Sequence, residues 1–194
     1  MDNMIHAQIT ESVDVFTAIQ NDNHLIAVVK NVVDVCVSAL NNKCKLLFMG
    51  NGGSAADCQH LAGEMVSRLS FDRPGLPAFA LTVDSSVMTA IANDYGYDCL
   101  FSRQVEAVAR PGDVLFGIST SGCSPNVLAG LTVARKMGVT TVGMTGNQKA
   151  DIVQASDYVI EIPSASTPKI QEGHILIGHI ICNLIEKRLF EHLK

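Results

Sequence analysis

Two stretches of glycine and hydroxyl-bearing residues follow apolar runs and have the composition of anion-binding loops. In the first, Gly50–Ser54, the glycines let a ligand approach the backbone, and Ser54 stands where the free amides of a helix N-terminus attract negative charge. The second, Ser119–Ser124, offers four hydroxyls within six residues and is followed by Pro125, so hydroxyls and free amides can surround a phosphate together. A tight strand-to-helix turn and helix capping by serine are the alternative interpretations of these stretches.

Groups able to transfer protons stand on two predicted helices. His60 and Glu64 are four residues apart on the helix after the first stretch, and therefore share one face. Gln171 and His179 are eight residues apart on the last helix, about 12 Å along its axis, and would reach one site only with extended side chains. Histidine with carboxylate serves zinc binding and proton transfer alike. A helix-surface contact for His60 and Glu64, and a core position for His179, are the alternatives.

A third polar segment has the chemistry of a polyol contact. Asn93 and Asp94 together offer the donors and acceptors that sugar hydroxyls need. Asp94 as a simple helix-end residue is the alternative.

Five short apolar runs alternate with helical periods and predict the elements that position these groups. The predicted strands are Leu46–Met49, Ala78–Leu81, Val114–Ile118, Thr140–Met144 and Tyr158–Ile162. Such alternation is typical of parallel βαβ units, and right-handed crossovers place helices on both faces. The sequence therefore predicts an α/β fold, a three-layer, doubly wound, five-stranded parallel sheet, with a final helix over Thr167–Phe190.

The first 42 residues have a different pattern. Two apolar-periodic segments over Ile5–Leu40 are separated by Asn21-Asp22-Asn23, whose short polar side chains favour a turn or cap. The apolar stripe of the second segment is wider than one sheet face requires, which indicates a helical oligomer interface. We expect a single domain, 1–194, in which residues 1–42 are a helical extension.

Composition narrows the class of protein. A net charge of −5 gives no indication of the clustered positive surface that binds nucleic acid. The sequence contains no uninterrupted apolar run of about 20 residues, so a membrane span is not expected. The N-terminus lacks a signal-peptide pattern, and the six cysteines form no C-x-x-C pair. We expect a cytoplasmic protein with reduced thiols. Neither a P-loop nor a G-x-G-x-x-G motif is present, which gives no support to a nucleotide ligand.

Taken together, these motifs resemble the phosphoheptose isomerases of the sugar-isomerase (SIS) domain superfamily, over nearly the whole chain. The motifs are Gly50–Asp57, His60 with Glu64, Asn93–Gly96, Gly117–Gly122, and Ile170–Glu172 with His174 and His179. The resemblance implies a flavodoxin-like SIS domain that isomerises D-sedoheptulose 7-phosphate to D-glycero-D-manno-heptose 7-phosphate. It also implies a homotetramer with one zinc ion per subunit.

The resemblance also implies roles for individual residues. Glu64 and His179 match the acid–base pair. The matching metal-binding positions are His60, Glu64, Gln171 and His179. The matching substrate-binding positions are Asn51, Gly52, Gly53, Ser54, Glu64, Asn93, Asp94, Ser119, Thr120, Ser121, Ser124 and Gln171.

A protein without catalytic activity is the alternative from another class. A SIS-domain protein that binds a replication initiator resembles this chain in the phosphate loops but lacks the proton-transfer pair, and a sugar-phosphate-binding protein without turnover would keep Ser119–Ser124 and tolerate loss of Glu64. Because this chain has both Glu64 and His179, the sequence favours the enzyme, and the remaining enzyme alternative acts on another ketose phosphate.

Overall fold

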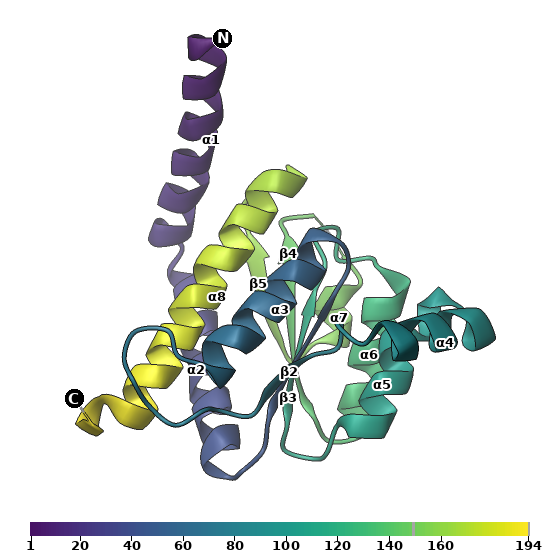
Figure 1. The fold of residues 1–194 in the computed structure, drawn as a ribbon. Coiled ribbons are helices and arrows are strands. Elements are labelled where there is room, and N and C mark those ends of the chain that lie inside the picture. Colours follow the sequence, from purple (N-terminus) through teal and green to yellow (C-terminus); the bar gives the residue numbers. More distant parts are fainter. Residues whose placement is uncertain (149, 194) are drawn as a thin grey trace.

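A five-stranded parallel sheet forms the centre of the computed structural model, which describes residues 1–148 and 150–193 (Figure 1). The predicted domain span includes Lys149 and Lys194, which lie outside the described residues. The strands are β1 (Leu46–Gly50), β2 (Ala78–Ala80), β3 (Val114–Ile118), β4 (Thr140–Gly146) and β5 (Tyr158–Ile162). All five predicted strands are confirmed, with ends that differ by no more than two residues.

Helices cover both faces of this sheet, which confirms the predicted three layers. They are α1 (Asp2–Asn21), α2 (Asn23–Asn41), α3 (Gly53–Val66), α4 (Ser85–Tyr95), α5 (Leu100–Val108), α6 (Pro125–Lys136), α7 (Ile152–Ala155) and α8 (Thr167–Phe190), with single 3-10 turns at Tyr97–Cys99 and Glu191–Leu193. Side chains of α1, α2, α3 and α8 join one apolar core with one sheet face, where the rings of Phe48 and Phe116 stack 4.9 Å apart. Side chains of α5, α6 and α7 join a second core on the other face.

The strand order β2-β1-β3-β4-β5 determines where a ligand can bind. From β1 the chain moves to β2 on one side, and all later strands lie on the other side, so the order reverses between β1 and β3. At such a switch point the loops after the two strands diverge and leave a crevice. Gly50 at the end of β1 pairs in register with Ile118 at the end of β3, so both predicted phosphate loops begin side by side.

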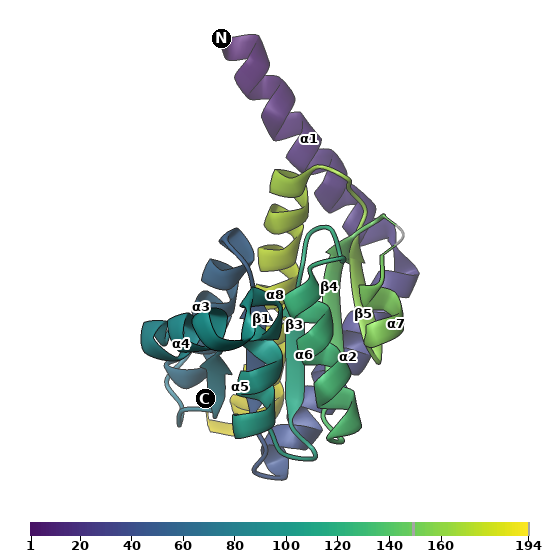
Figure 2. The same cartoon turned by 90° about the vertical axis from the view of Figure 1, so that its right-hand side faces the viewer.

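The N-terminal helices are arranged differently from each other. Asp22 ends the first helix and caps the second, because its Oδ1 accepts a hydrogen bond of 2.9 Å from the Leu25 amide. By length and composition α2 could cross a membrane. However, its buried face contacts α8 and β5, as expected for the core helix of a globular domain. By contrast, α1 extends beyond the body of the molecule (Figure 2), and only Val15 and Ile19 of this helix are buried.

Candidate active site

The loop after β3 forms a compact cluster of hydroxyls. The Ser119 Oγ lies 2.8 Å from the Ser124 Oγ and 3.4 Å from the Ser121 Oγ, and it accepts a hydrogen bond of 3.1 Å from the Gly122 amide. Ser124 is the N-cap residue of α6, and Pro125 occupies its first turn. Hydroxyls and the free amides of a helix N-terminus therefore converge, which is the arrangement that binds phosphate.

The loop after β1 is closely packed against the last helix. Gly52 has a φ of +55°, which favours glycine, and Ser54 is buried in the first turn of α3. A side chain at Gly53 would lie 2.5 Å from the Nε2 of Gln171, so the absence of a side chain there lets Gln171 of α8 reach the loop. The structure thus brings together Gly53 and Gln171, two residues predicted to contact the substrate.

Asn126 and Tyr97, which the sequence did not single out, both contact Asn51 of the first loop. Asn51 and Asn126 exchange two amide hydrogen bonds, each of 2.9 Å, which join the first loop to the start of α6. The Tyr97 hydroxyl donates to the Asn51 Oδ1 at 3.0 Å. Asn126 lies two residues after the predicted loop Ser119–Ser124, but the sequence does not reveal which residue its buried amide pairs with.

The predicted proton-transfer groups of α3 and α8 meet further along the helix that begins at the first loop. The His60 Nε2 lies 2.7 Å from the His179 Nε2 and 3.4 Å from the Glu64 Oε1. Residues far apart in the sequence therefore lie together, and His179 is partly exposed rather than a core residue. The contact between His60 and Glu64 is also the helix-surface contact of the alternative interpretation, so the roles of these residues stay a prediction. The Glu64 side chain is 19% exposed and the His60 side chain 48% exposed, so the cluster is accessible to a substrate.

Close packing of the two helices produces this contact. A side chain at Gly178 would lie 2.7 Å from a methyl carbon of Leu61, so Gly178 lets α8 approach α3. His179 directly follows Gly178 on α8, and His60 directly precedes Leu61 on α3, so the same close approach brings the two imidazoles together. Figure 1 shows α3 and α8 side by side on one face of the sheet.

Asp57 is a further acidic group at this cluster. It lies one helical turn before His60, and its Oδ2 is buried without a hydrogen-bond partner among the described residues. Burial raises the pKa of the Asp57 carboxyl, although the charges of His60 and His179 act in the opposite direction. The sequence analysis did not place Asp57 in this cluster, although its i, i+3 spacing from His60 is a signal that could have done so.

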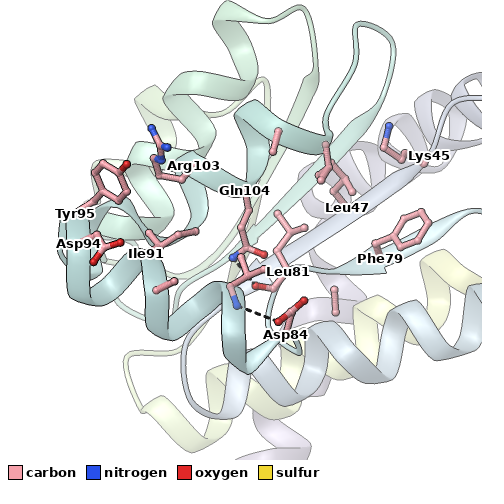
Figure 3. Close-up of a pocket in the computed structure, with 15 residues that line it drawn as sticks. Lys45, Leu47, Phe79, Leu81, Asp84, Ile91, Asp94, Tyr95, Arg103 and Gln104 are labelled. Atoms are coloured by element: carbon pink, nitrogen blue, oxygen red, sulfur yellow. Dashed lines mark hydrogen bonds between the residues drawn. The ribbon is translucent and has the colours of Figure 1, made fainter.

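Asn93 and Asp94 lie at the C-terminal end of α4, where the Asn93 Nδ2 donates to the Asp94 Oδ1 at 2.8 Å. Asp94 lines a largely apolar groove of about 640 Å³ between α4, α5 and the edge strand β2 (Figure 3). Arg103 lies at the same end of this groove, with its guanidinium carbon 4.2 Å from the centre of the Tyr95 ring. Tyr97, rather than Asp94, contacts the first phosphate loop, so the polyol role of this segment stays a prediction.

The chemistry of the cluster fits a zinc ion. One donor atom from each of His60, Glu64 and His179 lies within 4.8 Å of the others, and two imidazole nitrogens with a carboxylate oxygen are a common zinc ligand set. Gln171 stands two turns before His179 on the same helix and packs against Gly53. Its role as a fourth ligand stays a prediction.

The fold and these loops define a class of protein. The chain belongs to the SIS domain family, whose model matches residues 8–146. A phosphoheptose isomerase of Burkholderia pseudomallei (strain K96243) is 54% identical over 182 residues, which cover 94% of this chain and 92% of the relative. That of Aneurinibacillus thermoaerophilus is 48% identical over 192 residues, 99% of this chain and 97% of the relative.

Solved structures agree with these relatives. The structure of phosphoheptose isomerase GmhA from Neisseria gonorrhoeae is 38% identical, with a TM-score of 0.89 over 96% of this chain and 98% of that chain. A phosphoheptose isomerase from Francisella tularensis is 31% identical, with a TM-score of 0.90 over 95% and 97% of the two chains. Within the SIS domain family, the chain belongs to the phosphoheptose isomerases, which confirms the resemblance inferred from its motifs.

Proposed function

We propose that this protein isomerises D-sedoheptulose 7-phosphate to D-glycero-D-manno-heptose 7-phosphate, in heptose biosynthesis. The observation that carries the proposal is the convergence of His60, Glu64 and His179 where α3 and α8 meet, on a helix that begins at one of the two hydroxyl- and amide-bearing loops at the switch point of the sheet. Membership of the phosphoheptose isomerases supports the substrate. Glu64 lies ten residues after Ser54, about 15 Å along α3, and this separation suits an extended sugar chain whose phosphate binds at the loops.

The reaction moves a proton between C1 and C2 of the sugar, and it needs one base and one acid. In our proposal the Glu64 carboxylate takes a proton from C1 while His179 donates one to the carbonyl oxygen at C2, which yields the enediol. Glu64 then returns a proton to C2, and His179 takes one from the oxygen at C1. The Glu64 carboxylate and the His179 imidazole both lie near the His60 Nε2, and one donor atom of each lies within 4.8 Å of the other, so both can face one sugar carbon pair.

Zinc is the proposed cofactor, with one ion per subunit held by His60, Glu64, Gln171 and His179. A bound zinc ion would polarise the sugar carbonyl as a Lewis acid. A carboxylate that binds a metal is a weaker base, so the two proposed roles of Glu64 compete. The three donors that converge support the ligand set.

We also propose a cytoplasmic homotetramer in which the helical extension, residues 1–42, forms subunit contacts. Exposed apolar side chains of α1 support this, because isolated apolar stripes on a projecting helix are typical of interfaces. They are Met4, Ile5, Ile9, Val13 and Phe16. A groove of about 320 Å³ between α1, α2 and α8 continues the apolar surface. Light scattering on a size-exclusion column measures the mass, and a monomer would contradict the proposal.

The experiment that tests the function compares three proteins with sedoheptulose 7-phosphate and with other ketose phosphates as substrates. The wild type should form the heptose phosphate, and Glu64→Gln should lose at least about 100-fold in kcat, the scale of removing a general base. Glu106→Gln, an exposed substitution on α5, is the control and should keep full activity. Equal product from Glu64→Gln and Glu106→Gln would remove Glu64 from the mechanism.

A further inference from the structure

The guanidinium of Arg73 binds the backbone of the candidate base. Its Nη2 donates to the carbonyl oxygen of Glu64 at 2.8 Å, and its Nη1 donates to the carbonyl oxygen of Met65 at 2.6 Å. These are two of the last carbonyls of α3, which have no partner within the helix. Arg73 therefore caps α3 at the turn that carries Glu64.

Arg73 is held in turn by the last helix. Glu186 of α8 accepts from the Arg73 Nε at 3.1 Å, and from the amides of Leu69 and Ser70 at 3.0 and 2.7 Å. Neither side chain of this pair is exposed. Although burial alone would raise the pKa of Glu186, the hydrogen bonds from the two amides and from Arg73 hold this pKa below its ordinary value. The pair is thus a buried ion pair whose carboxylate oxygens both have hydrogen-bond partners.

The position of Glu186 on its helix connects the pair to the candidate acid. Glu186 follows His179 by seven residues, which is two turns of α8, so both side chains lie on similar sides of the helix. The contact at Gly178 holds α8 near His60, and the Arg73–Glu186 pair holds the two helices together again one to two turns further along. Two separate contacts determine the relative position of two helices better than one.

We propose that Arg73 and Glu186 are positioning residues, which set the distance between Glu64 and His179 by fixing the end of α3 to α8. This inference rests on the proposed function, because it takes Glu64 and His179 as the reacting pair. Displacing a catalytic group by about 1 Å costs on the order of 100-fold in rate, so a small movement of α3 is sufficient to affect the reaction. Substrate binding through the loops should change little, since those loops lie at the opposite end of α3.

A second buried carboxylate provides a matched control. Asp113 accepts from two backbone amides, those of Lys45 and Arg110, and from the Lys45 Nζ at 2.6 Å. Its side chain is 2% exposed. It directly precedes β3, at the end of the sheet where the strands begin, and the phosphate loops lie at the opposite end. Asp113→Asn therefore removes the same type of contact as Glu186→Gln, but away from the candidate site.

The experiment compares wild type, Arg73→Lys, Glu186→Gln and Asp113→Asn. Urea unfolding gives the stability and the folded fraction of each protein, so that kcat can be expressed per folded molecule. Steady-state kinetics with sedoheptulose 7-phosphate separates kcat from KM. Competition with a chromophoric chelator gives the zinc affinity, which does not depend on turnover.

Arg73→Lys and Glu186→Gln should each lower kcat per folded molecule by 10-fold or more, while KM stays within about two-fold of the wild-type value. Each should also weaken zinc binding by about 10-fold, which is the usual effect of replacing a residue that supports a metal ligand. Asp113→Asn should lose comparable stability and keep kcat and zinc affinity. The inference is overturned if the two substitutions change kcat and zinc affinity no more than Asp113→Asn does. Full activity of Glu64→Gln would instead refute the proposed function, and the zinc affinities would then decide the positioning role alone.

Discussion

Burial of one histidine makes the stability of this protein depend on pH. His174 of α8 is 1% exposed, its Nε2 lies 3.3 Å from the carbonyl oxygen of Thr145, and its Nδ1 has no hydrogen-bond partner among residues 1–148 and 150–193. Removal from water lowers the pKa of His174 from 6.5 to about 4, although the hydrogen bond with Thr145 acts in the opposite direction. The folded protein therefore holds this imidazole neutral at pH 5, whereas the unfolded chain protonates it.

The sign and size of the effect follow from this difference. Between pH 6.5 and about 4 the unfolded state binds one more proton at His174 than the folded state, so the free energy of unfolding falls as the pH falls. At about 1.4 kcal/mol per pKa unit, the full change is about 3 kcal/mol. Glu186 also loses stabilising contacts in acid, but only below its ordinary carboxyl pKa of 4.5, because its folded pKa is lowered.

Urea unfolding followed by circular dichroism measures this dependence at several pH values from 7.5 to 4.5. A chelator is present throughout, so that loss of metal adds no pH dependence of its own. We expect the wild type and a control, His24→Gln at an exposed position, to lose about 2–3 kcal/mol over this range, and His174→Gln to lose much less. If His174→Gln and wild type change equally with pH, the reasoning is wrong.

Two further predictions concern the site. Gly178→Ala places a methyl group against Leu61 and forces α3 and α8 apart, so it should lower the free energy of unfolding by about 1–3 kcal/mol and weaken zinc binding. Urea unfolding and chelator competition measure the two effects. Unchanged zinc affinity would contradict the close packing of the two helices. Ser119→Ala removes the hydroxyl that contacts Ser124. In steady-state kinetics, KM for the sugar phosphate should rise by about 10-fold, with a smaller change in kcat. An unchanged KM would exclude Ser119 from phosphate binding.

The strands and the phosphate loops were predictable because their signals are local. Four of the five apolar runs are followed directly by a glycine or a hydroxyl residue, and parallel strands bring their carboxyl ends to one edge of the sheet. Gly50 and Ile118 therefore pair as the pattern requires. The last helix, Thr167–Phe190, has the bounds that the sequence predicts.

Side-chain pairs between distant elements were not predictable. The two amide hydrogen bonds between Asn51 and Asn126 depend on the side-by-side placement of two loops, and nothing in the sequence of either segment identifies its partner. Arg73 lies in a segment without regular structure, where an arginine is normally exposed, and its burial depends on Glu186, which is 113 residues away. The resemblance to a family identified the reacting groups, but it gave no information on what holds them in place.

The exchange of the C1 protons of sedoheptulose 7-phosphate with solvent tests the role of Glu64 most directly. In D₂O, proton NMR follows the loss of the C1 signal and the appearance of the aldose in one sample. The wild type should exchange this proton and form product, while Glu64→Gln should do neither at a measurable rate and His179→Gln should form product at least about 100-fold more slowly. Exchange in Glu64→Gln at the wild-type rate would contradict the account.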